Sequence, residues 1–249
     1  MLKIIQITDC HLFSDISKHG YNDINPFNSL KLVLEQVTLT DIDWIIVTGD
    51  ISGDGSEQSY QHFMSLIRQL NLSDFLLVIA GNHDNLAHMH KHFPAKSLCL
   101  DNPHFAIADN WHVHLLHTPT ATSTGHISTA SLNALEEYLA IHSDDYHLIA
   151  VHHHPISCGG WMDKHEWQNR QTFTSQVAAH PAVKGVIYGH IHTASEIQQG
   201  LCLYMACPAT CWQFATQATF SLSPLQPGYR VINLTKNGQI NTTVHRLTE

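Results

Sequence analysis

Basic residues are scarce in this sequence of 249 residues. It contains 12 lysines and arginines against 21 aspartates and glutamates, which gives a formal net charge of −9. Lysine and arginine form no cluster, whereas proteins that bind nucleic acids or anionic membrane surfaces normally present a basic face. We therefore expect neither kind of partner. If the substrate is anionic, metal ions rather than side chains would have to supply the positive charge.

Long apolar runs and paired cysteine motifs are also missing. No hydrophobic segment approaches the length of a membrane-spanning helix, and the N-terminal residues show no signal-peptide pattern. None of the six cysteines forms a C-x-x-C pair, and a chain with 43% hydrophobic residues needs no disulfide to fold. We interpret Cys207 and Cys211 as ordinary buried thiols. The expectation is a soluble cytoplasmic protein with a single domain over residues 1–249.

Histidine, in contrast, is abundant. The chain has 22 histidines, more than its lysines and arginines combined. Histidine is the commonest metal ligand and a frequent general acid or base. Most of these residues must still have other roles; His88, His90 and His92, for example, have the spacing of a solvated helix face. Position in the chain therefore decides how each histidine is interpreted.

The first third of the chain predicts alternating strands and helices. Apolar runs at 3–8, 44–47 and 75–80 are typical of buried strands, and helices are expected from Asn25-Pro26 and from about Ser56. This order indicates a mostly parallel sheet with crossover helices. Ligands of such sheets bind beyond the carboxyl ends of the strands. The polar residues that follow the three strands should therefore converge: Asp9 and His11, Gly49-Asp50, and Gly81-Asn82-His83-Asp84.

The same alternation continues, less regularly, to the end of the chain. Short strands are expected within 97–117, helices from about Ser128 and Asn169, and a loop at 157–168. A strand at 147–151 ends at His152-His153-His154-Pro155, and a strand at 183–188 ends at Gly189-His190-Ile191-His192. From Thr193 to Val244, shorter strands broken by Gly, Pro and Asn indicate a second, mixed sheet packed on the first. The fold class is α/β (α+β).

Five strand ends thus carry donor groups that suit metal ions. They offer two carboxylates, one amide oxygen and four or five imidazoles, a mixture that favours Mn, Fe or Zn over Ca or Mg. These ligands are too many for one ion but suffice for two if one carboxylate bridges. Paired ions ~3.5–4 Å apart are a known arrangement for hydrolysing phosphate esters. Each motif alone has an ordinary alternative, since Asp9 or Gly81-Asn82 could simply form a turn.

Together the five motifs, Asp-x-His, Gly-Asp, Gly-Asn-His-Asp, His and Gly-His-x-His, resemble the calcineurin-like metallophosphoesterase family. The resemblance covers residues 9–192 in the family order. It implies a four-layer αββα sandwich in which two mixed β-sheets are flanked by helices. It also implies two divalent metal ions, Fe or Mn first and Zn as an alternative. One ion would be held by Asp9, His11, Asp50 and His192, and the other by Asp50, Asn82, His152 and His190.

Within that family the sequence is most similar to the class III bacterial 3′,5′-cyclic AMP phosphodiesterases, over nearly its whole length. The similarity includes the three histidines before Pro155, Trp161-Met162-Asp163 and the segment 208–214, which should shape substrate access. One departure is Leu115-Leu116-His117-Thr118, where such proteins often carry Asp-Ser. The departure leaves the metal ligands intact but affects the expected local contacts with substrate.

The resemblance implies hydrolysis of 3′,5′-cyclic AMP, a small-molecule nucleotide, to 5′-AMP. In this hypothesis a hydroxide that bridges the metals attacks phosphorus, and His83, which is not a ligand, acts as the acid for the leaving 3′ oxygen. Six residues would contact the substrate: His11, Asp50, Asn82, His83, His152 and His192. Two alternatives remain. One is a broader metallophosphoesterase for glycerophosphodiesters, 2′,3′-cyclic nucleotides or other phosphoesters, and the other is a metal-free protein-binding scaffold.

Several nearby residues have two interpretations. Asp54 could orient His83 or belong to a helix cap. Asp84 could cap a helix at Asn85 or brace the turn. Trp161, Trp212 and Phe214 could stack on adenine or only pack the core. His153 and His154 are expected to point away from the metals, with His152 as the ligand.

Overall fold

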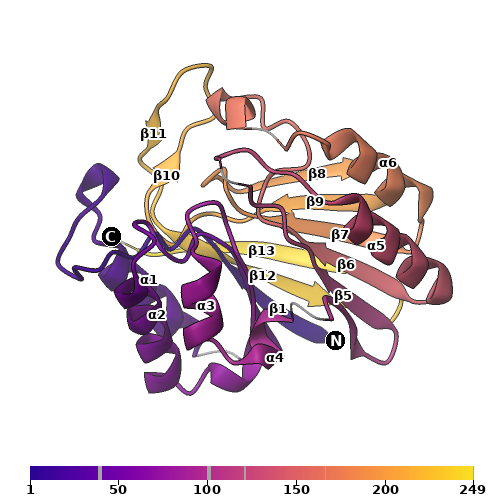
Figure 1. The fold of residues 1–249 in the computed structure, drawn as a ribbon, viewed down its shortest axis with the longest axis horizontal. Helices are drawn as coiled ribbons and strands as arrows, with labels where there is room; N and C mark the ends of the chain where they lie inside the picture. Colours follow the sequence, from indigo (N-terminus) through magenta and orange to yellow (C-terminus); the bar gives the residue numbers. More distant parts are fainter. Residues whose placement is uncertain (39–40, 100–101, 121, 166, 249) are drawn as a thin grey trace.

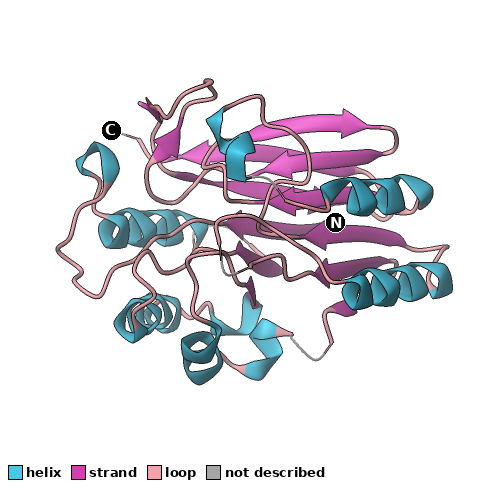
Figure 2. Ribbon diagram, turned by 45° about the horizontal axis from the view of Figure 1, so that its top comes forward, coloured by secondary structure: helices cyan, strands magenta, loops and turns pink. Residues whose placement is uncertain are grey.

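Two β-sheets lie face to face between two layers of helices in the computed structural model of the chain, which describes residues 1–38, 41–99, 102–120, 122–165 and 167–248 (Figures 1 and 2). This is the four-layer αββα sandwich expected from the sequence. Among the described helices, none has the length and apolar character needed to cross a membrane.

The first sheet has the strand order β13-β12-β1-β2-β3. Its parallel part consists of β1 (Leu2–Ile7), β2 (Trp44–Thr48) and β3 (Leu76–Ile79). The crossover helices α1 (Pro26–Val37) and α2 (Glu57–Gln69) cover its outer face together with α3 (Leu86–His92) and α4 (Ala95–Leu98) (Figure 1). The predicted parallel unit is therefore confirmed, and the carboxyl ends of β1, β2 and β3 lie side by side.

The second sheet has the order β4-β5-β6-β7-β9-β8. Helices α5 (Thr129–Ile141) and α6 (Arg170–Ala179) lie on its outer face (Figure 1). The strands β5, β6, β7 and β9 are mutually parallel, whereas β4 and β8 are antiparallel edges. The strand bounds are β4 His104–Ala108, β5 Trp111–Leu115, β6 Tyr146–Ala150, β7 Val183–Tyr188, β8 Ser195–Gln199 and β9 Cys202–Ala206.

Shorter elements connect the helices and strands. The 3₁₀ turns are η1 (Tyr21–Asp23), η2 (Ser73–Phe75) and η3 (Trp161–His165), and η2 leads directly into the amino end of β3. The two-stranded ribbon of β10 (Gln213–Phe214) and β11 (Leu222–Ser223) projects beyond the sandwich (Figure 1).

Three expectations about the fold need correction. The region after Thr193 does not form the second sheet, because β12 (Gly228–Leu234) and β13 (Ile240–Arg246) return to pair beside β1 in the first sheet. Only β8 and β9 of that region join the second sheet. Residues 97–98 are helical, in α4, and the 157–168 loop contains η3. Alternation of apolar residues predicts that a segment is a strand, but not which strand it pairs with. The pattern therefore could not predict which sheet contains β12.

The helix starts follow the sequence signals. Asn25, Ser56 and Ser128 accept hydrogen bonds from backbone N–H groups in the first turns of α1, α2 and α5. These N-caps satisfy donors that have no partner inside the helix. The predicted starts of all three helices are confirmed.

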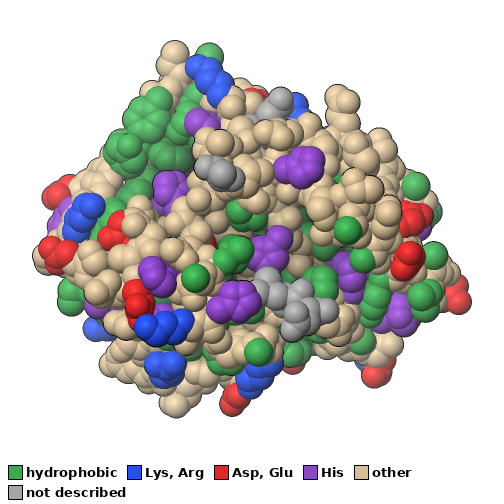
Figure 3. All heavy atoms as spheres, viewed as in Figure 1, with side chains coloured by type: hydrophobic (Ala, Val, Ile, Leu, Met, Phe, Trp, Pro, Cys, Tyr) green, Lys and Arg blue, Asp and Glu red, His purple; other side chains and the backbone are tan. Residues whose placement is uncertain are grey.

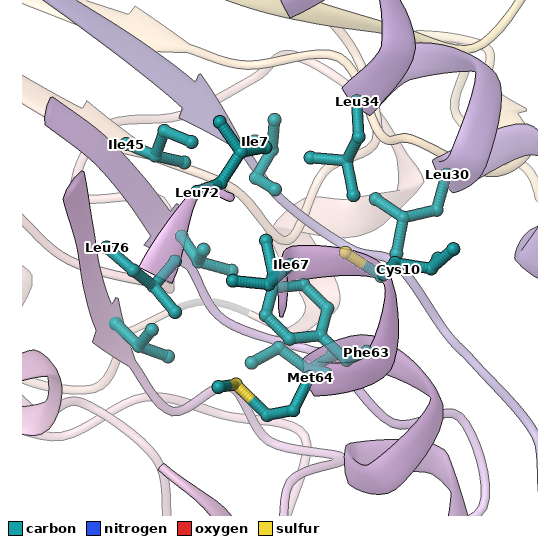
Figure 4. Close-up of a cluster of buried hydrophobic side chains, with 14 of the residues drawn as sticks. Ile7, Cys10, Leu30, Leu34, Ile45, Phe63, Met64, Ile67, Leu72 and Leu76 are labelled. Carbon is teal, nitrogen blue, oxygen red and sulfur yellow. The ribbon is translucent and has the colours of Figure 1, made fainter. Parts of the chain in front are cut away.

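Hydrophobic cores fill the three spaces between the four layers. The core between the first sheet and its helices includes Ile7, Leu34, Phe63 and Ile67, which point toward one another in Figure 4. A second core separates the sheets, and a third lies under α5 and α6. Packing on both faces holds the strands rigidly, so residues just beyond the strand ends have well-defined positions.

Candidate metal centre

The predicted ligand residues of both sheets meet at one edge of the sandwich. Asp9, Asp50 and Asn82 follow β1, β2 and β3, while His152 and His190 follow β6 and β7 of the other sheet. Six of the seven predicted ligands are buried, and Asn82 is half-buried. The structure thus brings together residues that are far apart in the chain, as the parallel strand order predicted.

Five of these residues adopt a backbone conformation that is unusual for side chains larger than glycine. The φ angle is 51° at Asp9, 47° at His11, 52° at Asp50, 69° at His190 and 47° at His192. The left-handed region costs roughly 1–2 kcal/mol for each such residue. Strain of this kind gathers at functional sites, where the surrounding structure holds it in place. Here it turns the side chains sharply inward from the ends of the strands.

The first group of donor atoms comes from Asp9, His11 and His192. His192 Nε2 lies 3.4 Å from Asp9 Oδ1 and 3.0 Å from His11 Nε2. His11 Nε2 is 3.7 Å from Asp50 Oδ2, which extends the group toward the next strand. Among the described residues Asp9 Oδ1 is buried without a hydrogen-bond partner. A buried carboxylate oxygen that faces imidazole nitrogens and has no donor suits a cation.

The second group comes from Asp50, Asn82, His152 and His190. His152 Nε2 lies 3.4 Å from Asp50 Oδ2 and 3.1 Å from Asn82 Oδ1. Asp50, His152 and His190 offer ligand atoms that all lie within 4.8 Å of one another. His190 Nε2 is buried and has no partner in the described part of the chain. Because Asp50 Oδ2 faces both groups, Asp50 lies between two adjacent positions for metal ions.

In both Asp9 and Asp50, one carboxylate oxygen accepts hydrogen bonds from the protein and the other faces the candidate metal centre. Asp9 Oδ2 accepts hydrogen bonds from Thr8 Oγ1 (2.8 Å) and from the backbone N–H of His190 (2.9 Å). Asp50 Oδ1 accepts from the backbone N–H of His83 at 2.8 Å. Gly81 permits this approach, because a Cβ atom there would lie only 2.1 Å from Asp50 Oδ1. Close packing of the backbone, more than a turn, is therefore what requires glycine at position 81.

Backbone carbonyls orient two of the imidazoles. His152 Nδ1 lies 2.7 Å from the carbonyl oxygen of Thr48, and His192 Nδ1 lies 2.9 Å from that of Trp212. These nitrogens must donate, so a neutral ring presents an unprotonated Nε2 to the centre. Metal-binding histidines normally have such a partner on the other ring nitrogen. The sequence motifs did not reveal these partners, because a carbonyl group has no sequence signature.

The charges of the site also fit divalent cations. Burial opposes ionisation of Asp50, yet the neighbouring His152 holds the pKa of its carboxyl well below the usual value. Burial opposes protonation of His152 in the same way, but Asp50 and Asp9 raise its pKa to about 9. The carboxylates of Asp50 and Asp9 thus stabilise a positive charge at the position of His152. A metal ion among the same atoms would supply that charge and leave the imidazole neutral.

His83 lies beside these groups and is exposed. Its ring meets that of His11 edge to face, with centroids 5.0 Å apart. Asp54 does not orient it: the carboxylate of Asp54 accepts instead from the backbone N–H groups of Ser14 and Ser56. The pairing of Asp54 with His83 considered from the sequence is therefore absent.

Asp84 braces the turn that carries His83. It accepts hydrogen bonds from the backbone N–H groups of Gly81 (2.8 Å) and Ser52 (3.0 Å) and from the Tyr60 hydroxyl (3.1 Å). The cap of α3 is Asn85, whose side chain accepts from the first turn of that helix. Of the two roles considered for Asp84, bracing is the one that the structure supports.

The three consecutive histidines point in different directions. His152 faces the centre, whereas His153 Nδ1 lies 2.9 Å from Thr118 Oγ1 and His154 Nε2 lies 3.3 Å from Asp163 Oδ1. The choice of His152 as the inward residue is consistent with this geometry. Thr118, part of the segment that departs from the cyclic AMP phosphodiesterase pattern, is buried and supports His153. Thr118 therefore lies on the side of His153 that faces away from the two donor groups.

The buried thiols and the helical histidines lie outside the two donor groups. Cys211 Sγ is 3.9 Å from His192 Nδ1, the ring nitrogen already bonded to the carbonyl of Trp212. Burial raises the pKa of Cys207 to about 12, so this thiol stays protonated. His92 binds Glu57 at 2.9 Å on the helical side. The thiols keep the interpretation drawn from the sequence, but the expected solvated helix face is only partly confirmed. His90 is exposed, whereas His88 and His92 are half-buried, with His88 Nδ1 lying 3.1 Å from the carbonyl oxygen of Gly55.

A cavity of about 770 Å³ opens over the centre. Its floor includes His11, Asp50, Asn82, His83, His190 and His192, and its walls include Phe13, Lys18, Tyr21, Trp161, Trp212, Phe214 and Phe220. Hydrophobic side chains gather over β10 and β11 at the upper left of Figure 3. Phe220, in the segment between these two strands, is exposed. Lys18, Tyr21 and Phe220 were missed from the sequence, because they come from loops without regular periodicity.

The aromatic walls differ in how freely they can meet a ligand. Trp212 is buried and stacks on His11, with centroids 5.4 Å apart. Trp161 lies edge to face with Phe214 at 4.9 Å and with Phe220 at 5.0 Å. Trp212 therefore packs against a candidate ligand, while Trp161 and Phe220 form the outer wall.

Comparison with known proteins places the chain among phosphoesterases. The model of the family described as "Calcineurin-like phosphoesterase" matches residues 2–194. The 3′,5′-cyclic adenosine monophosphate phosphodiesterase CpdA of Vibrio vulnificus is 33% identical over 99% of this chain and 90% of its own length. The enzyme of the same name from Escherichia coli K12 is 32% identical over 100% of this chain and 90% of its own. A dimetal phosphatase from Danio rerio has the same fold, with a TM-score of 0.69 at 14% identity over 99% of each chain.

Proposed function

This chain belongs to the calcineurin-like phosphoesterase family, and we propose that it is a two-metal phosphodiesterase that hydrolyses 3′,5′-cyclic AMP to 5′-AMP. The observation that carries the proposal is the position of Asp50 Oδ2, which faces both groups of donor atoms beneath a cavity with aromatic walls. The CpdA relatives, at 32–33% identity over nearly the whole chain, support cyclic AMP as the substrate.

The two metal positions follow from the two donor groups. Asp9, His11, Asp50 and His192 would hold one ion, and Asp50, Asn82, His152 and His190 would hold the other. Imidazole, carboxylate and amide donors suit iron, manganese or zinc. When bound, the two cations supply a nucleophilic water of lowered pKa and positive charge for the phosphoryl oxygens. The chain contributes the fixed geometry, because its left-handed residues and carbonyl contacts hold the ligands before any metal arrives.

His83 acts as the acid for the leaving oxygen. Its backbone is fixed by the hydrogen bond to Asp50, and its ring lines the floor of the cavity beside His11. It therefore lies next to the metal ligands and is free to donate a proton to the 3′ oxygen as the ester bond breaks. General acid catalysis of this kind contributes ~10²–10⁴-fold to the rate.

The substrate lies across the centre and against the outer wall. Of the six residues expected to contact the substrate, His11, Asp50, Asn82, His83 and His192 line the cavity around the cyclic phosphate, whereas His152 is buried beneath them. The base extends toward Trp161 and Phe220, where stacking on an aromatic ring contributes ~1–3 kcal/mol. Lys18 lines the same cavity and adds positive charge near an anionic ligand.

A substrate panel on metal-reconstituted protein tests the proposal. The panel contains 3′,5′-cyclic AMP, 2′,3′-cyclic AMP, 3′,5′-cyclic GMP, glycerophosphocholine and an aryl phosphodiester. We expect the highest kcat/KM for 3′,5′-cyclic AMP. Equal or higher values for glycerophosphocholine or the aryl ester would replace the proposal with a broader phosphodiesterase. A chain that takes up no metal and hydrolyses none of them would be a binding scaffold.

A further inference from the structure

A second group of histidines lies beneath α5, on the outer face of the second sheet. Along β5, Trp111 and Val113 belong to the core between the sheets, so the alternating His112 and His114 face α5. His104 is paired with His114 across β4 and β5, and His147 with His112 across β5 and β6. Imidazoles therefore occupy positions that a sheet covered by helices normally fills with aliphatic side chains.

Three of these histidines form a hydrogen-bonded chain, which leaves His104 Nε2 buried without a partner among the described residues. His147 Nε2 lies 3.0 Å from the carbonyl oxygen of His142 and must donate to it. His147 Nδ1 then accepts from His114 Nε2 at 2.9 Å, and His114 Nδ1 accepts from His104 Nδ1 at 2.9 Å. Burial lowers the pKa of His147 to about 4, which keeps that ring neutral. The ring nitrogens of His114 and His147 are all engaged, so neither is available to a ligand.

His112, His142 and Asp145, here called the α5 triad, are arranged differently. His112 Nε2 lies 2.9 Å from Asp145 Oδ2, and His142 Nδ1 lies 4.0 Å from the same oxygen. The three ligand atoms all fall within 4.8 Å of one another. Ligand atoms around a tetrahedral zinc ion, each ~2.0–2.1 Å from the metal, are about 3.3 Å apart. The observed separations lie on both sides of that value, so small side-chain rotations would complete the site.

The surroundings of the α5 triad resemble those of a metal site. Tyr138 Oη lies 2.9 Å from His112 Nδ1 and orients the ring through the nitrogen that faces away from Asp145. Such a partner on the second nitrogen is usual for metal-binding histidines. The backbone N–H of Asp145 donates to the carbonyl of His142, which fixes the turn between them. His112 is buried, while the side chains of His142 and Asp145 are 35% and 31% exposed, which leaves access from solvent.

We propose that the α5 triad binds a divalent transition-metal ion, zinc by the chemistry of its two imidazoles and one carboxylate. This site is separate from the candidate metal centre, since Asp145 precedes β6 and His152 follows it, about 20 Å away along the strand. The ion would tie the C-terminal end of α5 to β5. The inference concerns other residues than the proposed catalytic function and does not depend on it.

Zinc stoichiometry tests the proposal directly. Wild-type protein and variants are dialysed against the same micromolar free zinc, and bound zinc per chain is measured by elemental analysis. We expect His142→Ala to bind one zinc ion fewer than wild type. Tyr138→Phe removes a partner of a ligand and should lower the affinity for that zinc ion by ~10–100-fold. Asp145→Asn changes a ligand itself and should lower the affinity by more than that. Because the result is a difference between proteins, the occupancy of the catalytic centre cancels.

His180→Ala is the matched control. His180 also binds a carboxylate, that of the exposed Glu136 at 2.9 Å, and is half-buried at the end of α6. It should bind as much zinc as wild type. Equal zinc in wild type and His142→Ala, or an equal loss in His180→Ala, would overturn the proposal. A crystal grown with zinc should also show an anomalous peak ~2.0–2.1 Å from His112 Nε2, and a peak elsewhere only would count against the site.

Discussion

Two regions of this molecule are rich in histidine, and they use it in opposite ways. At the candidate metal centre the histidines lie just beyond strand ends and face Asp9 and Asp50. Beneath α5, His114 and His147 lie within regular strands and bond to other imidazoles. The residue type is the same, but its place along the strand decides its neighbours. A side chain within a strand has the side chains of neighbouring strands as its neighbours. Beyond the strand ends, turns of the backbone direct side chains from several strands toward one point.

The electrostatic consequences differ in the same way. Burial lowers the pKa of His114 well below its usual value, and the neighbouring His147 lowers it further. Burial acts on His152 as well, but the two carboxylates outweigh it and raise its pKa. The buried imidazole of His114 is thus neutral, whereas the carboxylates around His152 require positive charge from a proton or a metal ion. Metal binding is expected where carboxylates face the imidazoles, at Asp9 and Asp50 and at Asp145 of the α5 triad. A contribution to stability is expected where imidazoles bond only to one another, as at His114.

The largest expected effect tests the carboxylate shared by both donor groups. Asp50→Asn keeps the size of the side chain but removes its charge between the two metal positions. We expect loss of bound metal and a fall in kcat/KM larger than the ~10²–10⁴-fold that a single acid–base group contributes. Elemental analysis and the cyclic AMP assay measure these effects. Glu136→Gln, beside His180 on the surface, is the control and should retain both; near-normal metal content in Asp50→Asn would contradict the assignment.

The next effect separates the acid from the ligands. His83→Ala should lower kcat by ~10²–10⁴-fold because proton donation to the leaving oxygen is lost, while metal content stays as in wild type. Steady-state kinetics and elemental analysis on the same preparation decide this. Asp54→Ala is the matched control, since Asp54 binds backbone N–H groups and not His83. Wild-type turnover in His83→Ala would end the proposed role.

A third change belongs to the region beneath α5. His114→Ala removes the ring between His104 and His147, so each neighbour loses a buried hydrogen bond. We expect the free energy of unfolding to fall by about 1–3 kcal/mol for each imidazole left without a partner. Denaturant unfolding measures this, and kcat/KM of the folded protein should not change. If His114→Ala left the free energy of unfolding unchanged but lowered kcat/KM, the histidines beneath α5 would have a functional rather than a structural role.

The smallest expected effect concerns the outer wall of the cavity. Trp161→Ala should raise KM for 3′,5′-cyclic AMP by about tenfold and leave kcat unchanged, because base stacking is worth ~1–3 kcal/mol. Initial-rate kinetics with cyclic AMP and with an aryl phosphodiester would separate stacking on adenine from a general loss of shape. A similar rise in KM for both substrates, or none for either, would remove Trp161 from adenine recognition.

The sequence alone determined the parallel unit and the positions of the polar strand ends. Buried strands are marked by short apolar runs. Asp9 and His152 mark where two of these runs stop, and Gly-Asp, Gly-Asn and Gly-His mark where three others stop. Because parallel strands end at one edge, Asp9, Asp50 and Asn82 had to converge there. Helix starts at Asn25, Ser56 and Ser128 were equally local, since a cap needs only the first turn of its own helix.

Only the tertiary structure decided how those ends are supported and which strands pair. The carbonyls of Thr48 and Trp212 that orient His152 and His192 belong to segments distant in the chain. The pairing of β12 with β1, and the facing of His112 and His114 toward α5, depend on sheet register. Backbone groups look alike at every residue, and alternation along a strand does not say which face is covered. The sequence therefore specified that the polar residues at the strand ends converge. The packing of the two sheets specified which backbone groups and neighbouring strands surround each of them.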